Sequence, residues 1–233
     1  MTVIWAILPA AGTGSRSGSS LPKQYRPLLG RPMIEHAMDV LAAHPDIDGL
    51  MLALAPDDRR WDGITHWRNK PLRTCLGGDE RRDSVLAALD ALAESGLAPD
   101  DWALVHDAAR PCLRVEDLHR LIEAASAHPV GGLLAGRMKD TMKRADADAQ
   151  VQGTLDRTPL WRAFTPQLFP ARSLRRALQH AAQENAVITD ESSAMERLGL
   201  SPLLVEGADD NIKVTLPDDF AFAEAILAAR GAH

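Results

Sequence analysis

Short apolar runs alternate with longer segments of helical periodicity through most of the chain. The strand-like runs are residues 3–8, 50–55, 102–106, 130–135 and 203–206. Apolar residues recur at helical spacing in residues 32–43, 83–94, 115–127, 171–184, 190–198 and 217–229. This alternation predicts an α/β fold, a mostly parallel sheet with helices on both faces. In such sheets, ligands bind outside the carboxyl ends of the strands.

The alternation stops between residues 137 and 166, where the sequence is polar and contains few apolar residues before Leu160. A loop of this length without structure is uncommon in a compact domain. We therefore predict a projecting arm over residues 137–160, with a hairpin as one form and dimerisation as its expected role. A disordered insertion is the alternative. We treat residues 1–233 as a single domain that carries this arm. Residues 211–214, near the end of the domain, are expected to be extended.

Composition and charge narrow the class of protein. Of the 233 residues, 45% are hydrophobic and 25% are charged, as expected of a globular chain. The net charge of −6 and the lack of a basic stripe argue against a nucleic-acid partner. No apolar window approaches 18 residues, and the first residues lack the charged start of a signal peptide, so no membrane role is expected. Cys75 and Cys112 have no metal-like spacing, which favours a reduced pair and a cytoplasmic location.

A glycine-rich loop, ILPAAGTGSRSGSSLPKQY, spans residues 7–25, from the end of the first strand into the adjoining segment. It does not match a P-loop, which requires a second glycine followed by lysine. Nor is it a dinucleotide fingerprint, because Ser17 stands where the third glycine belongs and Pro22 interrupts a helix. The loop instead carries two cations, Arg16 and Lys23. Backbone N–H groups and these cations suit a triphosphate; a surface turn with solvated charges is the alternative.

With PAAGTGSR at residues 9–16 and PKQY at 22–25, the chain resembles nucleotidyltransferases of the sugar-nucleotide type. More narrowly, it resembles the 2-C-methyl-D-erythritol 4-phosphate cytidylyltransferases of the non-mevalonate isoprenoid pathway. The likeness continues in family order through GGDER at 77–81, SV at 84–85, HDAARP at 106–111, DTMK at 140–143, DR at 156–157, TPQ at 165–167, TDE at 189–191 and DNIKV at 210–214. It implies a Rossmann-like three-layer sandwich of the nucleotide-diphospho-sugar transferase type, with a dimerisation arm.

The resemblance also implies a reaction, the transfer of CMP from CTP to methylerythritol 4-phosphate with release of pyrophosphate. Arg16 and Lys23 would be catalytic and would stabilise the transition state at the α-phosphorus. The residues that match the CTP site are Ala10, Ala11, Gly12, Gly14, Gly78, Asp79 and Ser84. For Asp79 and Ser84, the alternative is a helix cap with a polar residue in the first turn, because we expect a helix to begin at residue 83. Since the acceptor is a phosphate monoester that is largely ionised at neutral pH, no general base is needed, and we expect His106 to be structural.

For the acceptor, the matching residues are Asp107, Arg110, Thr141, Arg157, Thr165 and Lys213. Arg157 and Lys213 would hold the 4-phosphate, with Arg157 lent by the arm of a second subunit in a homodimer. The alternatives are an ion pair with Asp107 for Arg110, a solvated arm residue for Arg157 and an edge-strand charge for Lys213. Mg²⁺ or another divalent cation is expected, held mainly by the CTP phosphates, with Asp107 as a candidate ligand.

Two other functions remain open. A ribitol 5-phosphate type of cytidylyltransferase would share the loop and the mechanism, although HDAARP and Arg157 favour methylerythritol. A nucleotide-binding regulator that performs no transfer is a different class of protein. The presence of Arg16, Lys23 and Lys213 together argues against it, and the loop pattern excludes an NAD-dependent oxidoreductase.

Overall fold

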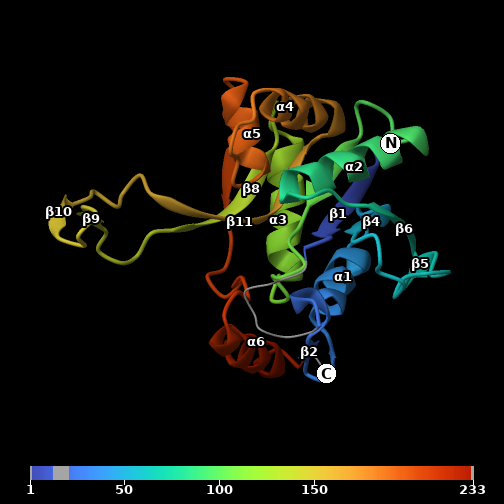
Figure 1. The fold of residues 1–233 in the computed structure, drawn as a ribbon, viewed down its shortest axis with the longest axis horizontal. Helices are drawn as coiled ribbons and strands as arrows, with labels where there is room; N and C mark the ends of the chain where they lie inside the picture. Colours follow the sequence, from blue (N-terminus) through green and yellow to red (C-terminus); the bar gives the residue numbers. More distant parts are fainter. Residues whose placement is uncertain (1, 13–20, 232–233) are drawn as a thin grey trace.

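A computed structural model describes residues 2–12 and 21–231 of the chain, and these residues build an α/β fold around one central sheet (Figure 1). Within them, eight strands pair in the order β12-β8-β11-β7-β1-β4-β6-β5. The strands are β1 (Ile4–Ala10), β4 (Gly49–Leu54), β5 (His66–Trp67), β6 (Lys70–Leu76), β7 (Trp102–Val105), β8 (Gly132–Arg137), β11 (Trp161–Pro170) and β12 (Leu203–Glu206). Only β11 and β5 run antiparallel to their partners in this described sheet. The prediction of a mostly parallel sheet is confirmed.

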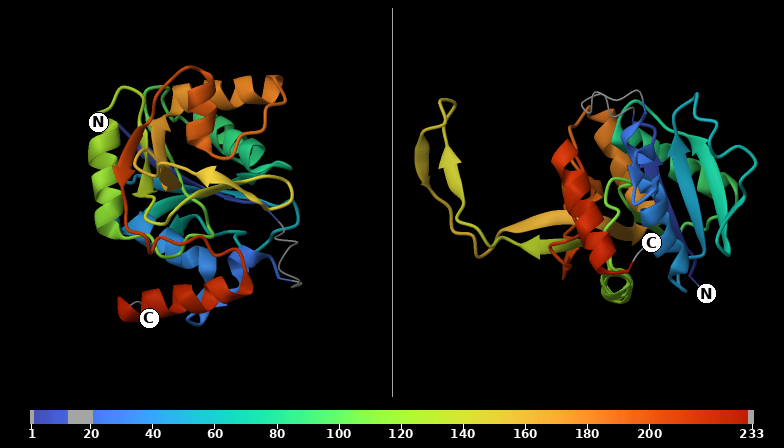
Figure 2. Two further views of the ribbon diagram at one scale, coloured as in Figure 1. Left: turned by 90° about the vertical axis from the view of Figure 1, so that its left-hand side faces the viewer. Right: turned by 90° about the horizontal axis from the view of Figure 1, so that it is seen from below.

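Helices cover both faces of the sheet because the central strands are apolar on both sides (Figure 2). In β1, Ala6 and Leu8 belong to the core beneath α1 (Met33–Ala43) and α3 (Val115–Ser126). Trp5 and Ile7 point to the other face, beneath α2 (Arg81–Glu94), α4 (Ala171–Gln183) and α5 (Glu191–Arg197). This side-chain alternation of period two produces the three layers. No helix in the described ranges is both long and apolar enough to cross a membrane.

A third, smaller core fixes the segment that comes after β12. Helix α6 (Pro217–Ala229) packs beside β2 (Pro27–Leu28), which pairs with β3 (Arg31–Pro32) (Figure 1). Phe220 of the helix joins Leu28, Cys112 and Val214 in one buried cluster. Because Val214 is locked in this cluster, the neighbouring residue Lys213 is held close to the main body of the protein.

The polar segment predicted as an arm forms a hairpin that stands away from the sheet (Figures 1 and 2). Its strands are β9 (Lys143–Ala145) and β10 (Val151–Thr154), which pair antiparallel. The carboxylate of Asp146 accepts the backbone N–H groups of Asp148 (3.1 Å) and Gln150 (2.9 Å) and so closes the turn. The structure thus has a hairpin here in place of the disordered insertion that was the alternative. A role of the arm in dimerisation stays a prediction.

Three parts of the fold differ from the expectation. Strands β5 and β6 had no apolar signature, because β6 lies near the sheet edge and buries only Leu72 among its side chains. Strand β11 was not predicted, because its first six residues lie within the segment expected to be a polar break in the sheet pattern. Residues 211–214 are extended but form no strand, so Lys213 is not an edge-strand charge.

We expect Leu52→Ala to destabilise the protein strongly, because Leu52 lies fully buried in β4 beneath α1. Loss of the buried side chain should lower the free energy of unfolding by about 2–5 kcal/mol in urea titrations. The matched change Leu204→Ala removes the same atoms from a side chain that is 42% exposed on β12. It should cost less than about 1 kcal/mol, and an equal loss in both variants would contradict this packing.

Candidate active site

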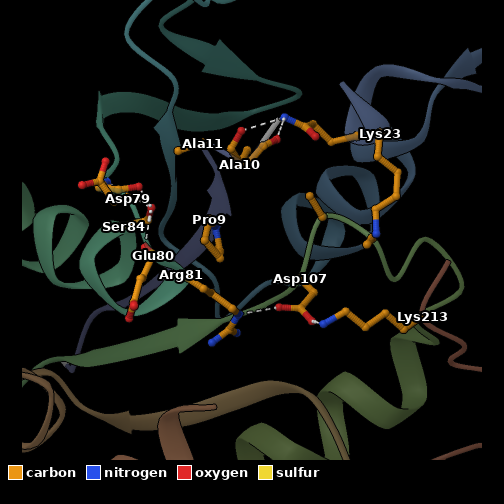
Figure 3. A pocket seen from close by; sticks show the side chains of 15 residues that line it. Pro9, Ala10, Ala11, Lys23, Asp79, Glu80, Arg81, Ser84, Asp107 and Lys213 are labelled. Carbon is orange, nitrogen blue, oxygen red and sulfur yellow. Dashed lines mark hydrogen bonds and ion pairs between the residues drawn. The ribbon is translucent and has the colours of Figure 1, made fainter. Parts of the chain in front are cut away.

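A cavity of about 260 Å³ opens at the carboxyl ends of β1 and β7 and beside the start of α2 (Figure 3). This is where ligands bind in sheets of this type. The cavity is lined by Pro9, Ala10, Ala11, Gly12, Lys23, Gln24, Gly78, Asp79, Glu80, Arg81, Ser84, Asp107, Ala108, Ala109 and Lys213. The structure therefore brings together all the predicted CTP-site residues that it describes, with Lys23, Asp107 and Lys213. The predicted residues Gly14 and Arg16 lie outside the described residues.

The turn between β6 and α2 requires two glycines because the chain packs tightly there. A Cβ atom on Gly77 would lie 2.5 Å from the Cβ of Ala11, and one on Gly78 would lie 2.4 Å from the Cβ of Asp83. The Gly78 N–H donates to the hydroxyl oxygen of Ser84 at 3.1 Å. Ser84 thus holds the turn against the start of α2.

Asp79 does not cap the helix that follows it. Helix α2 begins at Arg81, two residues earlier than expected, and Glu80 is its N-cap. Ser84 is a polar residue near the start of the helix, as its alternative role had it, and its hydroxyl is 3.2 Å from the carbonyl of Glu80. Both Asp79 and Ser84 also line the cavity.

Lys23 is positioned by the two residues after it in the short 3-10 helix η2 (Lys23–Tyr25). The side-chain amide of buried Gln24 donates to the carbonyl of Ala10 at 2.7 Å and to that of Gly12 at 3.3 Å. The Gln24 amide therefore joins the two ends of the glycine-rich loop. We did not predict this role for Gln24, although it lies within the PKQY motif.

Tyr25 anchors the other end of η2. Its hydroxyl donates to the carboxylate of Asp58 and accepts the indole N–H of Trp61 at 2.8 Å. Burial, together with the hydrogen bond to Asp58, raises the pKa of Tyr25 above its ordinary value, so the hydroxyl stays protonated. The side chains of Gln24 and Tyr25 thus anchor the short helix that carries Lys23.

Asp107 lies two residues beyond β7, and three cations approach its carboxylate, of which Figure 3 shows Arg81 and Lys213. Arg81 Nε donates to Oδ1 at 2.9 Å, Lys213 Nζ lies 2.8 Å from Oδ2, and Arg110 Nε lies 4.0 Å from Oδ2. Burial alone would raise the pKa of Asp107, but these charges outweigh it and hold the pKa well below its ordinary value. The carboxylate is therefore ionised.

Arg81 also binds a second, fully buried carboxylate. Its two terminal nitrogens contact the two oxygens of Glu191, at 2.5 and 3.0 Å. Burial tends to lower the pKa of Arg81, but the charges of Glu191 and Asp107 raise it above its ordinary value. Neither Arg81 nor Glu191 was predicted as a site residue. Both lie in motifs that carry the family resemblance, but the residues are 110 positions apart.

A second cavity of about 170 Å³ adjoins the first and shares Arg81, Asp107 and Lys213 with it. The predicted acceptor residues Arg110 and Thr165 line this cavity. The guanidinium of Arg110 donates to the carbonyl of Asn211 at 2.7 Å, in addition to its long contact with Asp107. Arg110 thus makes the contact with Asp107 that was considered as its alternative role, and it also lines the second cavity.

A chain of hydrogen bonds runs behind Asp107 and fixes the protonation of His106. The Asp107 N–H donates to the hydroxyl oxygen of Thr165 at 3.0 Å. That hydroxyl lies 3.0 Å from Nδ1 of His106, and Nε2 of His106 lies 3.0 Å from the carbonyl of Arg110. Since a carbonyl only accepts, Nε2 carries the proton and Nδ1 accepts from Thr165. Burial lowers the pKa of His106 to about 4, so the ring is neutral at pH 7.

The remaining predicted acceptor residues, Thr141 and Arg157, lie on the arm and line neither cavity. Both side chains are exposed, and the guanidinium of Arg157 donates to the carbonyl of Lys139 within the arm. One chain alone therefore does not bring Thr141 and Arg157 to Lys213.

Comparison with known proteins identifies the family. The family model described as IspD, 2-C-methyl-D-erythritol 4-phosphate cytidylyltransferase, matches residues 4–229. The chain belongs to this cytidylyltransferase family. A protein of that name from Xanthomonas euvesicatoria is 54% identical over 228 residues, which cover 98% of this chain and 86% of the relative.

Solved structures agree with this family assignment. A crystal structure of a 4-diphosphocytidyl-2C-methyl-D-erythritol synthase superposes with a TM-score of 0.83 at 38% identity, covering 97% of this chain and 100% of that one. The Francisella tularensis 2-C-methyl-D-erythritol 4-phosphate cytidylyltransferase gives 0.82 at 33% identity, with the same coverage. The three-layer sandwich expected from the sequence is thus the fold of this cytidylyltransferase family.

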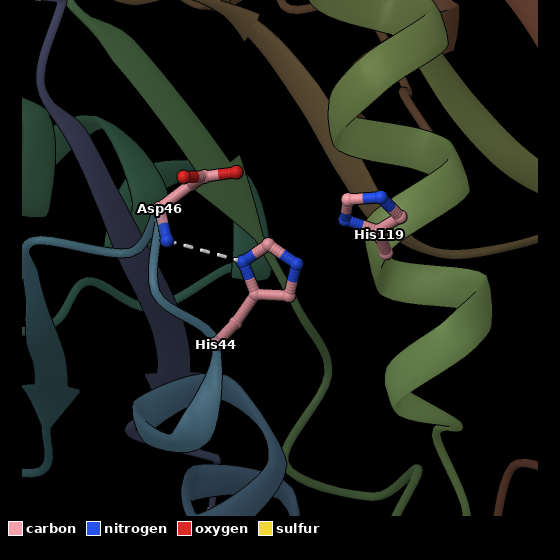
Figure 4. A group of neighbouring side chains, drawn as sticks. All are labelled: His44, Asp46 and His119. Atoms are coloured by element: carbon pink, nitrogen blue, oxygen red, sulfur yellow. Dashed lines mark hydrogen bonds between the residues drawn. The ribbon is translucent and has the colours of Figure 1, made fainter.

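A group of potential metal ligands lies away from both cavities of this cytidylyltransferase (Figure 4). His44 caps the end of α1, Asp46 lies two residues later, and His119 lies on α3. One ligand atom from each lies within 4.8 Å of the others. Two imidazoles do not suit Mg²⁺, which prefers oxygen ligands. This group is therefore not the metal site expected for a CTP-dependent transfer.

For this cytidylyltransferase, we expect the buried neutral His106 to weaken the fold in acid. The unfolded chain binds a proton at His106 near pH 6.5, whereas the folded chain does so only near pH 4. Unfolding is therefore increasingly favoured as the pH falls through this window. The stability difference between wild type and His106→Asn should shrink by about 2 kcal/mol from pH 7 to pH 4.5 in urea titrations.

The control for this measurement is His180→Asn, at a ring that is 39% exposed on α4. The stability difference between this variant and wild type should change by less than about 0.5 kcal/mol over the same pH range. A constant difference for His106→Asn as well would mean that His106 is not buried in its neutral form.

Proposed function

We propose that the larger cavity binds CTP, that the adjoining cavity binds methylerythritol 4-phosphate, and that CMP passes between them. The products are 4-diphosphocytidyl-2-C-methyl-D-erythritol and pyrophosphate, as expected of a member of this family of isoprenoid biosynthesis. The observation that carries the proposal is that Arg81, Asp107 and Lys213 line both cavities, so the two ligands would meet at one wall.

In this assignment, the triphosphate lies along the end of β1. Small residues at Ala10, Ala11 and Gly12 let the backbone approach it, and Lys23 and Arg16 neutralise its charge. The base lies against the Gly78–Asp79 turn, where backbone carbonyls can accept from the 4-amino group of cytosine. The tight packing of that turn supports this assignment, because it keeps the carbonyl positions fixed.

The acceptor phosphate attacks the α-phosphorus of CTP, and pyrophosphate leaves. A phosphate monoester with a second pKa near 6 is already a nucleophile at neutral pH. The state of His106 supports a mechanism without a general base, since both ring nitrogens are engaged and the ring is neutral. The residues then have to offset the repulsion between two anions and align them.

The acceptor phosphate is assigned to Lys213, with Arg157 supplied by the arm of a second subunit. The projection of the hairpin away from its own cavities supports this arrangement, because Arg157 has no ligand to contact within one chain. Thr141 lies on the same arm. We therefore propose a homodimer in which the arms exchange and each subunit completes the site of the other.

Mg²⁺ fits this site if it enters bound to the phosphates of the nucleotide. Both oxygens of Asp107 contact cations, which leaves that carboxylate poorly suited as a sole anchor. Mg²⁺ is commonly held by substrate phosphates with one or two carboxylates. When bound, it would neutralise charge on the triphosphate. Buried Asp107 and exposed Asp79 are carboxylates that line the proposed nucleotide cavity and could contribute a ligand. A cytoplasmic location, in keeping with the free thiols Cys75 and Cys112, is part of the same proposal.

A pyrophosphate-release assay tests the reaction. CTP is supplied with either methylerythritol 4-phosphate or ribitol 5-phosphate, each with and without Mg²⁺. We expect release with methylerythritol 4-phosphate and Mg²⁺, and loss of release on chelation. Release with ribitol 5-phosphate alone would identify the other cytidylyltransferase, and release with neither acceptor would favour a non-catalytic nucleotide-binding protein.

Mixing two inactive variants tests the shared site. Lys23→Ala and Arg157→Ala should each lower kcat/KM at least about 100-fold, since each removes a charge that faces the transferred or accepting phosphate. A heterodimer of the two contains one intact site, so reassociated mixtures should recover about a quarter of wild-type activity. Heterodimers verified by tags that show no recovery would rule out arm exchange.

A further inference from the structure

We propose that Arg81 and Glu191 form a positioning pair for this reaction. Their ion pair fixes Asp107 and thereby leaves Lys213 available to the acceptor phosphate. The inference rests on the proposed function and adds two residues to it, one from α2 and one from α5. Neither residue is assumed to touch the reacting atoms.

Neither residue suits its position without a partner. Arg81 is the first residue of α2, where the helix dipole disfavours a cation. Glu191 lies in the first turn of α5, where the dipole favours a carboxylate, but it is fully buried, and a buried carboxylate without a partner is costly. The ion pair between Arg81 and Glu191 offsets both costs.

The geometry of the pair determines which atom reaches Asp107. The terminal nitrogens of Arg81 are both engaged by Glu191, at 2.5 and 3.0 Å, which fixes the plane of the guanidinium. Nε then faces Oδ1 of Asp107 at 2.9 Å. Lysine could not reproduce this arrangement, because its ammonium group has no planar fork.

Asp107 is consequently shared between two cations on opposite sides (Figure 3). Arg81 binds Oδ1, and Lys213 binds Oδ2 at 2.8 Å. An acceptor phosphate has to compete with Asp107 for Lys213. If Arg81 is displaced, the full charge of Asp107 acts on Lys213 and strengthens that competition. The ion pair of Arg81 with Glu191 therefore sets the affinity of the neighbouring cavity for its phosphate.

Steady-state kinetics of Glu191→Gln test the inference. The substitution keeps the shape of the side chain but removes the charge that orients Arg81. We expect KM for methylerythritol 4-phosphate to rise about tenfold, which corresponds to about 1.4 kcal/mol. KM for CTP should change less than about twofold, because Lys23 and the glycine turn remain in place. A merely structural role would not separate the two KM values.

Arg81→Lys provides a second variant should Glu191→Gln fail to fold. Because Arg81 also lines the larger cavity, we expect KM for CTP to rise here as well, but less than KM for methylerythritol 4-phosphate. The matched control is Arg82→Lys. Arg82 is the next residue of α2, pairs with Asp83 at 2.9 Å and lines neither cavity. In this control both KM values should stay within about twofold of wild type.

Equal increases in both KM values, or a fall in kcat alone, would overturn the positioning pair. So would unchanged kinetics in the two variants. Wild-type turnover decides the underlying function separately: absence of pyrophosphate release would remove both proposals. Release with unseparated KM values in the variants would remove only this one.

Discussion

The buried carboxylate of Asp107 is the interaction on which the rest of the site depends. It stands at the carboxyl end of β7, and three cations from distant parts of the chain converge on it. Ion pairs of this kind are costly to desolvate and become favourable only when the geometry is held. The sheet, the third hydrophobic core and the Glu191 contact all contribute to that geometry. A protein with a net charge of −6 thereby gathers basic side chains where the two anionic ligands are proposed to meet.

The polar side chains around Asp107 and the glycine-rich loop hold the site in place and do not transfer protons. Thr165 accepts the Asp107 N–H, His106 is locked in one tautomer, and Gln24 joins the end of the glycine-rich loop to its start. Such preorganisation suits a reaction whose nucleophile needs no activation. His106 looks like a catalytic base in the sequence, yet its hydrogen bonds leave neither nitrogen available to a substrate.

Much of this structure could be predicted from the sequence, because it depends on local patterns. Short continuous apolar runs predicted the central strands, and the small residues of PAAG and GGD marked where the backbone is expected to approach a ligand. Strand β6 was missed because only Leu72 is buried along it. The contact between Arg81 and Glu191 was missed because two residues 110 positions apart leave no periodic signal. The arm could be located from its polarity, but a single chain does not show what the arm contacts.

The order of the elements along the chain has a consequence while the ribosome is still making the protein. The described residues proposed to hold the nucleotide, from Ala10 to Ser84, all leave the ribosome before the first acceptor residue, Asp107. The last cation, Lys213, is fixed only when α6 packs against β2 and Val214 is buried. Domains generally fold as units, and α6 is the last described helix to be made. A nascent chain that ends before α6 therefore cannot fix the lysine that is proposed to hold the second substrate.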